Sequence, residues 1–75
     1  MRHKNGHITG KVAYAMRQKR KENQTLFWHR LGVTQSGGCR YEHGRNIPEA
    51  VKLLLLLLAS GKLTSADLEA AVARI

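Results

Sequence analysis

The chain has little of what holds many small proteins together. Its 75 residues include one cysteine, Cys39, so no internal disulfide can form. The histidines are scattered, and no Cys/His spacing is typical of a zinc site. Only His3 and His7 share an i,i+4 spacing, in a polar, Gly-interrupted segment that is typical of a terminal tail. We therefore expect no metal, no cofactor and a fold held by packing alone.

Long apolar segments are also missing. The longest apolar run, Leu53–Ala59, has seven residues, whereas a membrane-spanning helix needs about 20. The N-terminus has charges but no apolar stretch long enough for a signal peptide. The sequence therefore predicts a cytoplasmic protein with no membrane partner. A cationic membrane-surface helix is disfavoured, because the charge and the apolar stripe lie on different expected helices.

Acidic residues are scarce, five against thirteen Lys and Arg, and the formal net charge is +8. No carboxylate pair or nucleophile–base pair stands out, so we expect neither an enzyme nor a small-molecule substrate. Residues 1–47 hold ten basic and two acidic residues, and residues 48–75 hold three of each. A basic region joined to a neutral one indicates a polyanion-binding surface on a packing scaffold; the alternative is a solvated face that aids solubility.

Helical periodicity is what the chain does have. Apolar residues recur at helical spacing, capping residues precede them, glycines follow them, and no strand pattern is present. The predicted fold is all-α, a compact bundle of about five short helices in residues 9–75, after a flexible basic tail over residues 1–8. The helices are expected from Thr9 to about Lys21, from Gln24 to Leu31, from Thr34 or Gln35 to His43, from Pro48 to Ser60 with Asn46 as N-cap, and from Thr64 or Ser65 onward.

Two of these helices form one unit, residues 24–43, with the sequence QTLFWHRLGVTQSGGCRYEH. Two short helices joined by a tight, glycine-containing turn are a helix-turn-helix unit, and here Gly32 supplies the turn. In such a unit the second helix, residues 35–43, enters the major groove of DNA. The apolar residues that hold the two helices together are Phe27, Leu31, Val33 and Tyr41.

The second helix carries side chains suited to base recognition. Gln35 can pair with the N6/N7 edge of adenine, and Arg40 can pair with O6 and N7 of guanine. Ser36 is short and can contact bases or phosphates. The plainer alternatives are that Gln35 only caps the helix and that Arg40 contacts only phosphate.

The stretch GVTQSGGCRYEHGR (residues 32–45), with FWHRL before it and NIP after it, resembles the lambda-repressor-like (Xre/Cro) helix-turn-helix proteins of bacteria and phages. The resemblance covers about residues 13–60 and implies a five-helix, lambda-repressor-like DNA-binding domain. It also implies operator binding on double-stranded DNA as a homodimer, and transcriptional repression in a phage or other mobile element.

The resemblance assigns site residues as well. It implies base-edge contacts for Gln35, Ser36, Cys39 and Arg40. It implies contacts along the DNA backbone for His43, Arg45 and Asn46, and for Gln24 either support of Gln35 or a phosphate contact. The cationic end of the first helix adds Lys21 and Arg17 to the phosphate set, and the resemblance also pairs Arg17 with Glu42.

The sequence departs from the family at three positions. Trp28 replaces a small residue and Gly38 replaces a β-branched apolar residue, at two positions that pack together in that fold. We therefore expect Trp28 to fill the space that Gly38 vacates, so that Gly38→Val would overpack the site at a cost of about 1–3 kcal/mol. Glu22 replaces an apolar residue, and a re-registered join there would break the Arg17–Glu42 pair.

The leucine run and the cysteine each have two interpretations. Seven consecutive apolar residues cannot all face inward in one 8.4 kDa domain. We expect the remainder, within the core-forming helices of residues 48–75, to form a dimer face with Leu68, Val72 and Ile75. Cys39 is either a thiol activated by Arg40 or, as we favour, a small residue tolerated on the groove-facing side.

The leading interpretation is a sequence-specific DNA-binding transcriptional regulator, most simply a repressor. The alternatives are an antitoxin whose C-terminal region binds a toxin, and a basic protein that binds RNA or DNA without reading its sequence. A helix that carries both Gln35 and Arg40 favours sequence reading, because charge alone needs no such residues. The four aromatic residues lie at core-like positions, which disfavours a base-stacking platform.

Overall fold

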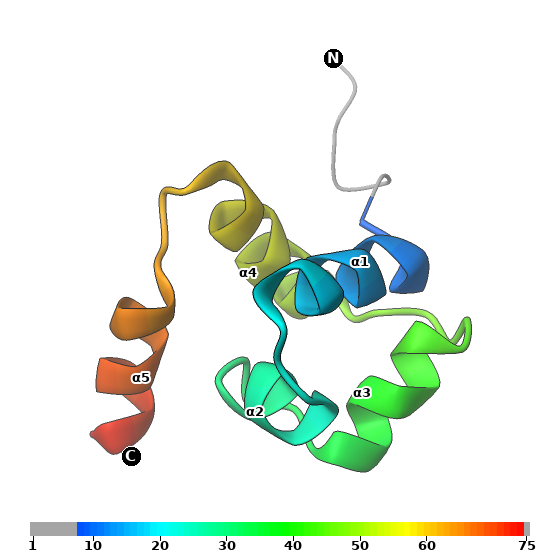
Figure 1. Ribbon diagram of the computed structural model, residues 1–75, viewed down its shortest axis with the longest axis horizontal. Helices are drawn as coiled ribbons and strands as arrows, with labels where there is room; N and C mark the ends of the chain where they lie inside the picture. Colours follow the sequence, from blue (N-terminus) through cyan, green and yellow to red (C-terminus); the bar gives the residue numbers. More distant parts are fainter. Residues whose placement is uncertain (1–7, 75) are drawn as a thin grey trace.

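Five helices make up most of residues 8–74, the part of the chain that the computed structural model describes (Figure 1). They are α1 (Gly10–Arg20), α2 (Gln24–His29), α3 (Gln35–Glu42), α4 (Glu49–Ser60) and α5 (Ser65–Ala73). These residues contain no strand, and the predicted all-α bundle is confirmed. No helix within residues 8–74 has the length and apolar character needed to cross a membrane.

The predicted tail and the His3/His7 pair lie outside the described residues, with the exception of Ile8. The prediction was wrong for Ile8, which is buried in the core. Its apolar side chain directly precedes the N-cap Thr9, a position from which side chains commonly fold back onto the first turns of a helix.

Side-chain caps explain where the helices begin. The Thr9 hydroxyl accepts a hydrogen bond from the backbone N–H three residues on, as predicted. Thr34, one of the two residues considered for the start of α3, caps that helix in the same way. Thr64 and Asp67 form a complete capping box at the start of α5. Asn23, which was not predicted as a cap, caps α2 by accepting from the Leu26 N–H at 2.8 Å.

Two predicted boundaries were wrong. The N-cap of α4 is Pro48, not Asn46; extended backbone at Pro48 (ψ 150°) delays the helix to Glu49. Helix α2 ends at His29, two residues before the predicted Leu31. The N–H groups of Leu31 and Gly32 donate back only three residues, to the Trp28 and His29 carbonyls, which tightens the chain into a turn.

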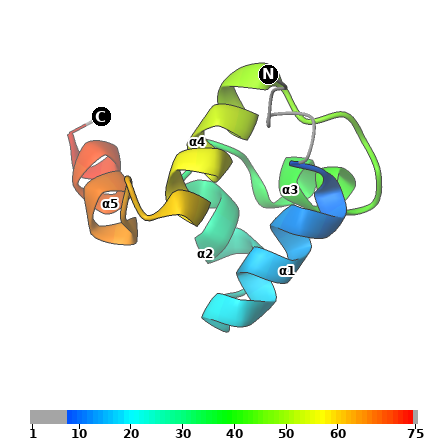
Figure 2. The same cartoon turned by 90° about the horizontal axis from the view of Figure 1, so that it is seen from above.

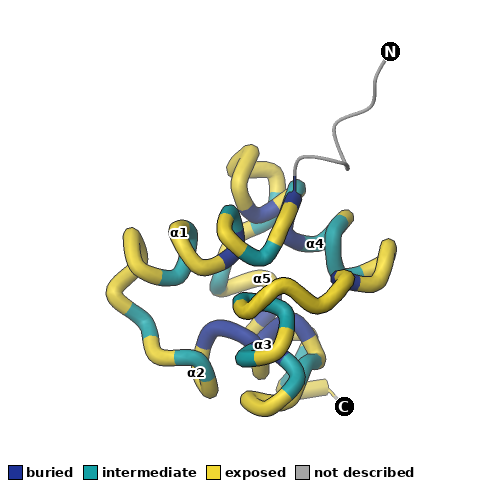
Figure 3. Tube along the Cα trace, turned by 90° about the vertical axis from the view of Figure 1, so that its right-hand side faces the viewer, coloured by how far each residue is buried: buried dark blue, intermediate teal, exposed yellow. Residues whose placement is uncertain are grey.

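The helices pack around side chains from α2 and α4. Phe27, Trp28 and Leu55 are the largest fully buried residues. Figures 1 and 2 both show α5 at the end of the molecule opposite α3, with α2 and α4 between them. The tube in Figure 3 shows the buried positions as short dark-blue runs separated by longer exposed stretches.

The leucines of α4 differ in burial, because only one side of this helix is in contact with the core. Leu55 and Leu58 are buried, whereas Leu53 and Leu57 are 45% and 40% exposed. The expectation that Leu68 belongs to an exposed dimer face was wrong, because it is buried in the core cluster. Val72 is half-buried, and Ile75 lies outside the described residues.

A buried arginine joins three segments of the chain. Arg30 is 7% exposed, and its guanidinium donates to both carboxylate oxygens of Glu22 at 2.9 and 2.7 Å. Its Nε donates to Glu69 of α5 at 3.0 Å. Glu22 therefore does not disturb the join between α1 and α2, because a buried cation compensates the carboxylate.

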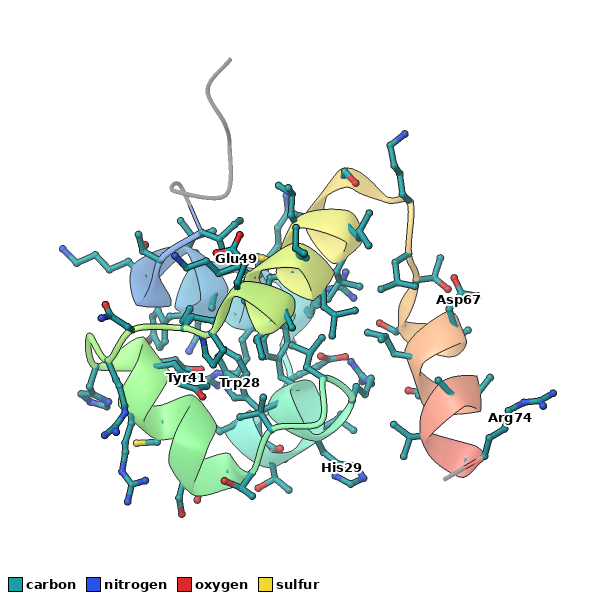
Figure 4. The ribbon with its side chains drawn as sticks, turned by 180° about the vertical axis from the view of Figure 1, so that it is seen from behind. Trp28, His29, Tyr41, Glu49, Asp67 and Arg74 are labelled. Atoms are coloured by element: carbon teal, nitrogen blue, oxygen red, sulfur yellow. The ribbon has the colours of Figure 1, made fainter. Side chains whose placement is uncertain are left out.

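Trp28 occupies the space beside Gly38, as predicted. A Cβ atom added to Gly38 would lie 2.2 Å from two ring atoms of Trp28, closer than real Cβ contacts allow. Edge-to-face contacts with Phe27 and Tyr41, at centroid distances of 5.3 and 5.6 Å, surround the indole. Figure 4 shows Trp28 and Tyr41 together where α2 and α3 meet. The glycine is required for close packing of these two helices.

We predict that Gly38→Ala destabilises the protein. Alanine would normally gain about 1 kcal/mol over glycine within a helix, but here its methyl group meets the Trp28 ring. We expect a lower melting temperature for Gly38→Ala and a larger drop, equivalent to about 1–3 kcal/mol, for Gly38→Val. Thermal melts followed by circular dichroism measure both.

Gly37→Ala is the matched control on the same helix. Its Cβ would lie 3.2 Å from the Thr34 hydroxyl and 3.3 Å from Val33, contacts that small shifts can relieve. Its melting temperature should therefore change much less. A Gly38→Ala protein that melts at or above the parent temperature would show that the indole does not need the glycine.

Candidate nucleic-acid interface

The two helices of the predicted helix-turn-helix unit are joined by a tight turn. Gly32 adopts a positive φ of 76°, a conformation that favours glycine, so the predicted turn is confirmed. The Val33 N–H donates to the Trp28 carbonyl at 3.0 Å and closes the turn against α2. Helix α3 then runs along the outside of the molecule (Figure 1).

Helix α3 has one packed side and one free side. Gly38 is buried and Tyr41 is half-buried on the packed side. The four predicted base-edge residues lie within the first six positions of the helix: Gln35, Ser36 and Arg40 are exposed, and Cys39 is half-buried. Residues three and four apart share a helix face, so Ser36 lies beside Cys39 and Arg40.

A buried carboxylate at the end of α3 accepts four hydrogen bonds from side chains of two other helices, α1 and α2. Only 3% of the Glu42 side chain is exposed. Its Oε2 accepts from Arg17 Nε at 2.8 Å and from Trp28 Nε1 at 2.9 Å. Its Oε1 accepts from Arg17 Nη2 and Gln24 Nε2, both at 3.0 Å. The Arg17–Glu42 pair implied by the resemblance is therefore present.

These donors also set the charge state of the carboxylate. Burial opposes ionisation of Glu42, but the hydrogen bonds from Arg17, Gln24 and Trp28 outweigh it and lower the pKa of the carboxyl group. The hydrogen bond to Glu42 in turn raises the pKa of Arg17. Glu42 is therefore anionic at neutral pH.

A further hydrogen bond connects this cluster to the free side of α3. Gln35 Nε2 donates to Gln24 Oε1 at 2.6 Å, which supports the first of the two roles considered for Gln24. The alternative that Gln35 only caps α3 was wrong, because the N-cap is Thr34. Gln35 is instead the first residue of the helix, exposed and held by Gln24.

The predicted phosphate residues divide into two groups. Lys21, His43, Arg45 and Asn46 are exposed, at the end of α1 and after α3. Arg17 is only 12% exposed, and its guanidinium donates to Glu42 and to the Glu22 carbonyl. Its main role in the fold is to hold Glu42.

Two basic residues near this group were not predicted as site residues. A surface hollow between the start of α1 and the α3–α4 connection is lined in part by Lys11, Lys52, His43 and Arg45. Lys11 lies two residues after the N-cap of α1, where backbone N–H groups favour anions. The position of Lys11 close to the start of a predicted helix was a signal that the sequence contained. Lys52 could not be predicted in this way, because only the folded chain brings it to the hollow.

Cys39 and His43 form a small cluster on α3. The Sγ of Cys39 lies 3.7 Å from His43 Nδ1, which also lies 2.8 Å from the Cys39 carbonyl oxygen. His43 is the C-cap of α3, so this contact belongs to the end of the helix.

A glycine turn between two packed helices, with the second helix exposed and basic residues at its end, defines a helix-turn-helix DNA-binding transcriptional regulator. The family model of the RsaL-like HTH domain matches residues 14–58, and the chain belongs to this family. The prediction of a helix-turn-helix regulator from the sequence is thereby confirmed, and the antitoxin and sequence-blind alternatives are not favoured.

A solved structure also resembles most of this fold. The quorum-sensing repressor RsaL of Pseudomonas aeruginosa is 39% identical to this chain, with a TM-score of 0.79. The match covers 83% of this chain and 91% of that chain. A comparison with curated protein sequences gives no match.

The lowered pKa of Glu42 predicts an acid-sensitive contribution to stability. Because the carboxyl pKa is lower in the folded state, its stabilising effect is complete above the ordinary value of about 4.5. That effect is lost as the pH falls from there through the folded-state pKa. We expect the free energy of unfolding, measured with urea between neutral pH and about pH 3, to fall accordingly.

The Glu42→Gln variant isolates this contribution. It lacks the titrating group, so the stability difference between parent and variant should shrink as the pH falls below 4.5. A difference that stays constant across this range would show that Glu42 ionisation does not stabilise the fold.

Proposed function

We propose that this protein is a transcriptional repressor that binds an operator by inserting α3 into the major groove. The observation that carries the proposal is the exposed side of α3, with Gln35 and Arg40 exposed on a helix whose other side is packed on Trp28. RsaL, described as a quorum-sensing repressor, resembles this chain over most of both lengths, which supports repression as the outcome of binding.

In this mechanism, side chains on the exposed side of α3 read the bases. Arg40 donates two hydrogen bonds to O6 and N7 of a guanine, and Gln35 pairs with the N6/N7 edge of an adenine. Ser36 and Cys39 are small enough to let the helix approach the base edges. Because α3 is fixed by packing on α2, its backbone is already ordered before binding, and only the side chains lose conformational entropy.

The phosphate backbone would position α3 in the groove. The exposed residues proposed for these contacts are Lys21, His43, Arg45 and Asn46, with Lys11 and Lys52 from the adjoining hollow. Gln24 and Arg17 act in this proposal chiefly by holding Gln35 and Glu42. Each neutralised phosphate releases counterions, so affinity should fall steeply with salt.

We also propose that the protein binds its operator as a homodimer through α4. Leu53 and Leu57 lie one turn apart and are both about half exposed, which makes an apolar stripe on the outside of the bundle. A two-fold dimer would read two half-sites about 34 Å apart on one face of the DNA.

The proposed function is tested with the DNA immediately upstream of the protein's own gene. Fluorescence anisotropy at about 150 mM salt compares this duplex with a scrambled duplex of equal length. We expect a preference of about 10³ or more for the upstream DNA, the lower end of typical specific binding. Equal affinity for both duplexes would contradict autorepression through this DNA.

Arg40→Ala separates base reading from phosphate binding. We expect a loss of about 1–3 kcal/mol on the operator and relaxed specificity at one base pair. The control is Lys21→Ala, which should weaken binding evenly on all sequences and lower the salt slope by about one. An Arg40→Ala loss that is equal on every sequence would make Arg40 a phosphate ligand.

The dimer is tested by placing a charge in the proposed interface. We expect sedimentation analysis to give a dimer for the parent protein and a monomer for Leu53→Glu, because an unpaired carboxylate is costly in an apolar interface. Leu26→Glu is the matched control, since Leu26 is equally exposed but lies on α2. A monomeric parent, or dissociation by both variants alike, would contradict an α4 interface.

A further inference from the structure

The hydrogen bonds that surround Glu42 have a fixed direction. An ionised carboxylate can only accept, and Arg17 and Trp28 can only donate. Gln24 must therefore turn its Nε2 toward Glu42 Oε1, at 3.0 Å, and this leaves its Oε1 on the other side. The order of oxygen and nitrogen in the Gln24 amide is set by a charge, not by a free choice between two equivalent orientations.

The orientation of the Gln24 amide also determines the orientation of the Gln35 amide on the exposed side of α3. Gln24 Oε1 accepts from Gln35 Nε2 at 2.6 Å, so one Nε2 hydrogen of Gln35 is used inside the protein. Its Oε1 and its second Nε2 hydrogen remain for the groove. One acceptor beside one donor matches the N6 donor and N7 acceptor of adenine.

The opposite order would favour a different base. If Gln24 presented its NH₂ group to Gln35, the Gln35 oxygen would accept that hydrogen bond, and both Nε2 hydrogens of Gln35 would point outward. Two donors match the O6 and N7 acceptors of guanine. The orientation of Gln24 therefore decides between the two purines.

We propose that Glu42 is a specificity-determining positioning residue: by accepting from Gln24, it orders the Gln24 and Gln35 amides so that α3 reads adenine. This inference rests on the proposed function, since it assumes that Gln35 faces a base. Arg17 and Trp28 fix the carboxylate with three further hydrogen bonds, so the acceptor facing Gln24 cannot rotate away.

Glu42→Gln tests the proposal with almost no change of shape. Oε2 of Glu42 receives donors from Arg17 Nε and Trp28, so the new amide oxygen should stay there. The new NH₂ group should then face Gln24, with loss of the single hydrogen bond from Arg17 Nη2 to Oε1. The oxygen and nitrogen of the Gln24 amide would then exchange places, and those of the Gln35 amide would exchange in turn. Competition anisotropy measures binding to operators that carry A, G, C or T at one base pair, which is located as the position where Gln35→Ala removes the base preference.

We expect the parent protein to prefer adenine over guanine there by about 5- to 150-fold, the range for one bidentate contact. Glu42→Gln should lower this ratio to about one or below. Gln24→Met, which cuts the connection but leaves the Arg17–Glu42 pair intact, should also level the ratio and serves if Glu42→Gln does not fold.

Trp28→Phe is the matched control for a purely structural role. It removes one hydrogen bond from Glu42 but leaves the carboxylate, so affinity and stability should fall while the adenine preference stays. A folded Glu42→Gln protein with the parent ratio would overturn the proposal, as would a Trp28→Phe protein that loses the ratio equally. A parent that reads the operator but prefers another base at this position overturns the inference alone; a parent that reads no operator overturns the proposed function.

Discussion

The packing of this small domain depends on one buried carboxylate. Glu42 sits at the end of α3, yet its partners come from α1 and α2, so its hydrogen bonds hold all three helices. Because each partner is a donor, removal of the charge would leave buried donors competing for a weaker acceptor. The same group thus holds the helices and is connected through Gln24 to Gln35 on the outer face, so a change at Glu42 acts on both the packing and that face.

A second buried charge plays a comparable part at the other end of α2. Arg30 is enclosed between Glu22 from the α1–α2 turn and Glu69 from α5. A hydrogen bond from Arg20 to Ser65, at 2.8 Å, adds another polar connection to α5. The family match stops at residue 58, so α5 lies beyond it. Polar contacts therefore supplement Leu68 in attaching a helix that contributes only one buried apolar side chain.

Local patterns predicted the helices well, because caps and glycines act over a few residues. Thr64 with Asp67, and Gly32 in its turn, are examples. The Trp28–Gly38 contact was predictable because both residues differ from the usual family residues at two positions that pack together. A larger residue at one of these positions implies a smaller residue at the other. Contacts set by tertiary geometry were not: nothing near Arg30 in the sequence indicates that Glu69, 39 residues away, completes its site.

The site shows the same division between local and long-range information. The helix-turn-helix unit and the family resemblance predicted the outward-facing side chains of α3, and the structure has Gln35, Ser36 and Arg40 exposed there. The sequence alone left the role of Gln24 open, because the choice depends on Glu42, 18 residues away. Leu68 was misplaced for a similar reason, since the side of α5 that turns inward depends on the path of the chain after α4.

The fit between Trp28 and Gly38 also constrains how this domain can change over generations. Enlarging Gly38 first forces a methyl group into the indole, and shrinking Trp28 first opens a cavity that costs about 3–5 kcal/mol in typical cores. Either order passes through a destabilised chain, in a domain class whose total stability is only about 5–15 kcal/mol. A change at either position alone therefore costs stability that a matched change at the other would restore, so the two positions are coupled in how the sequence can vary.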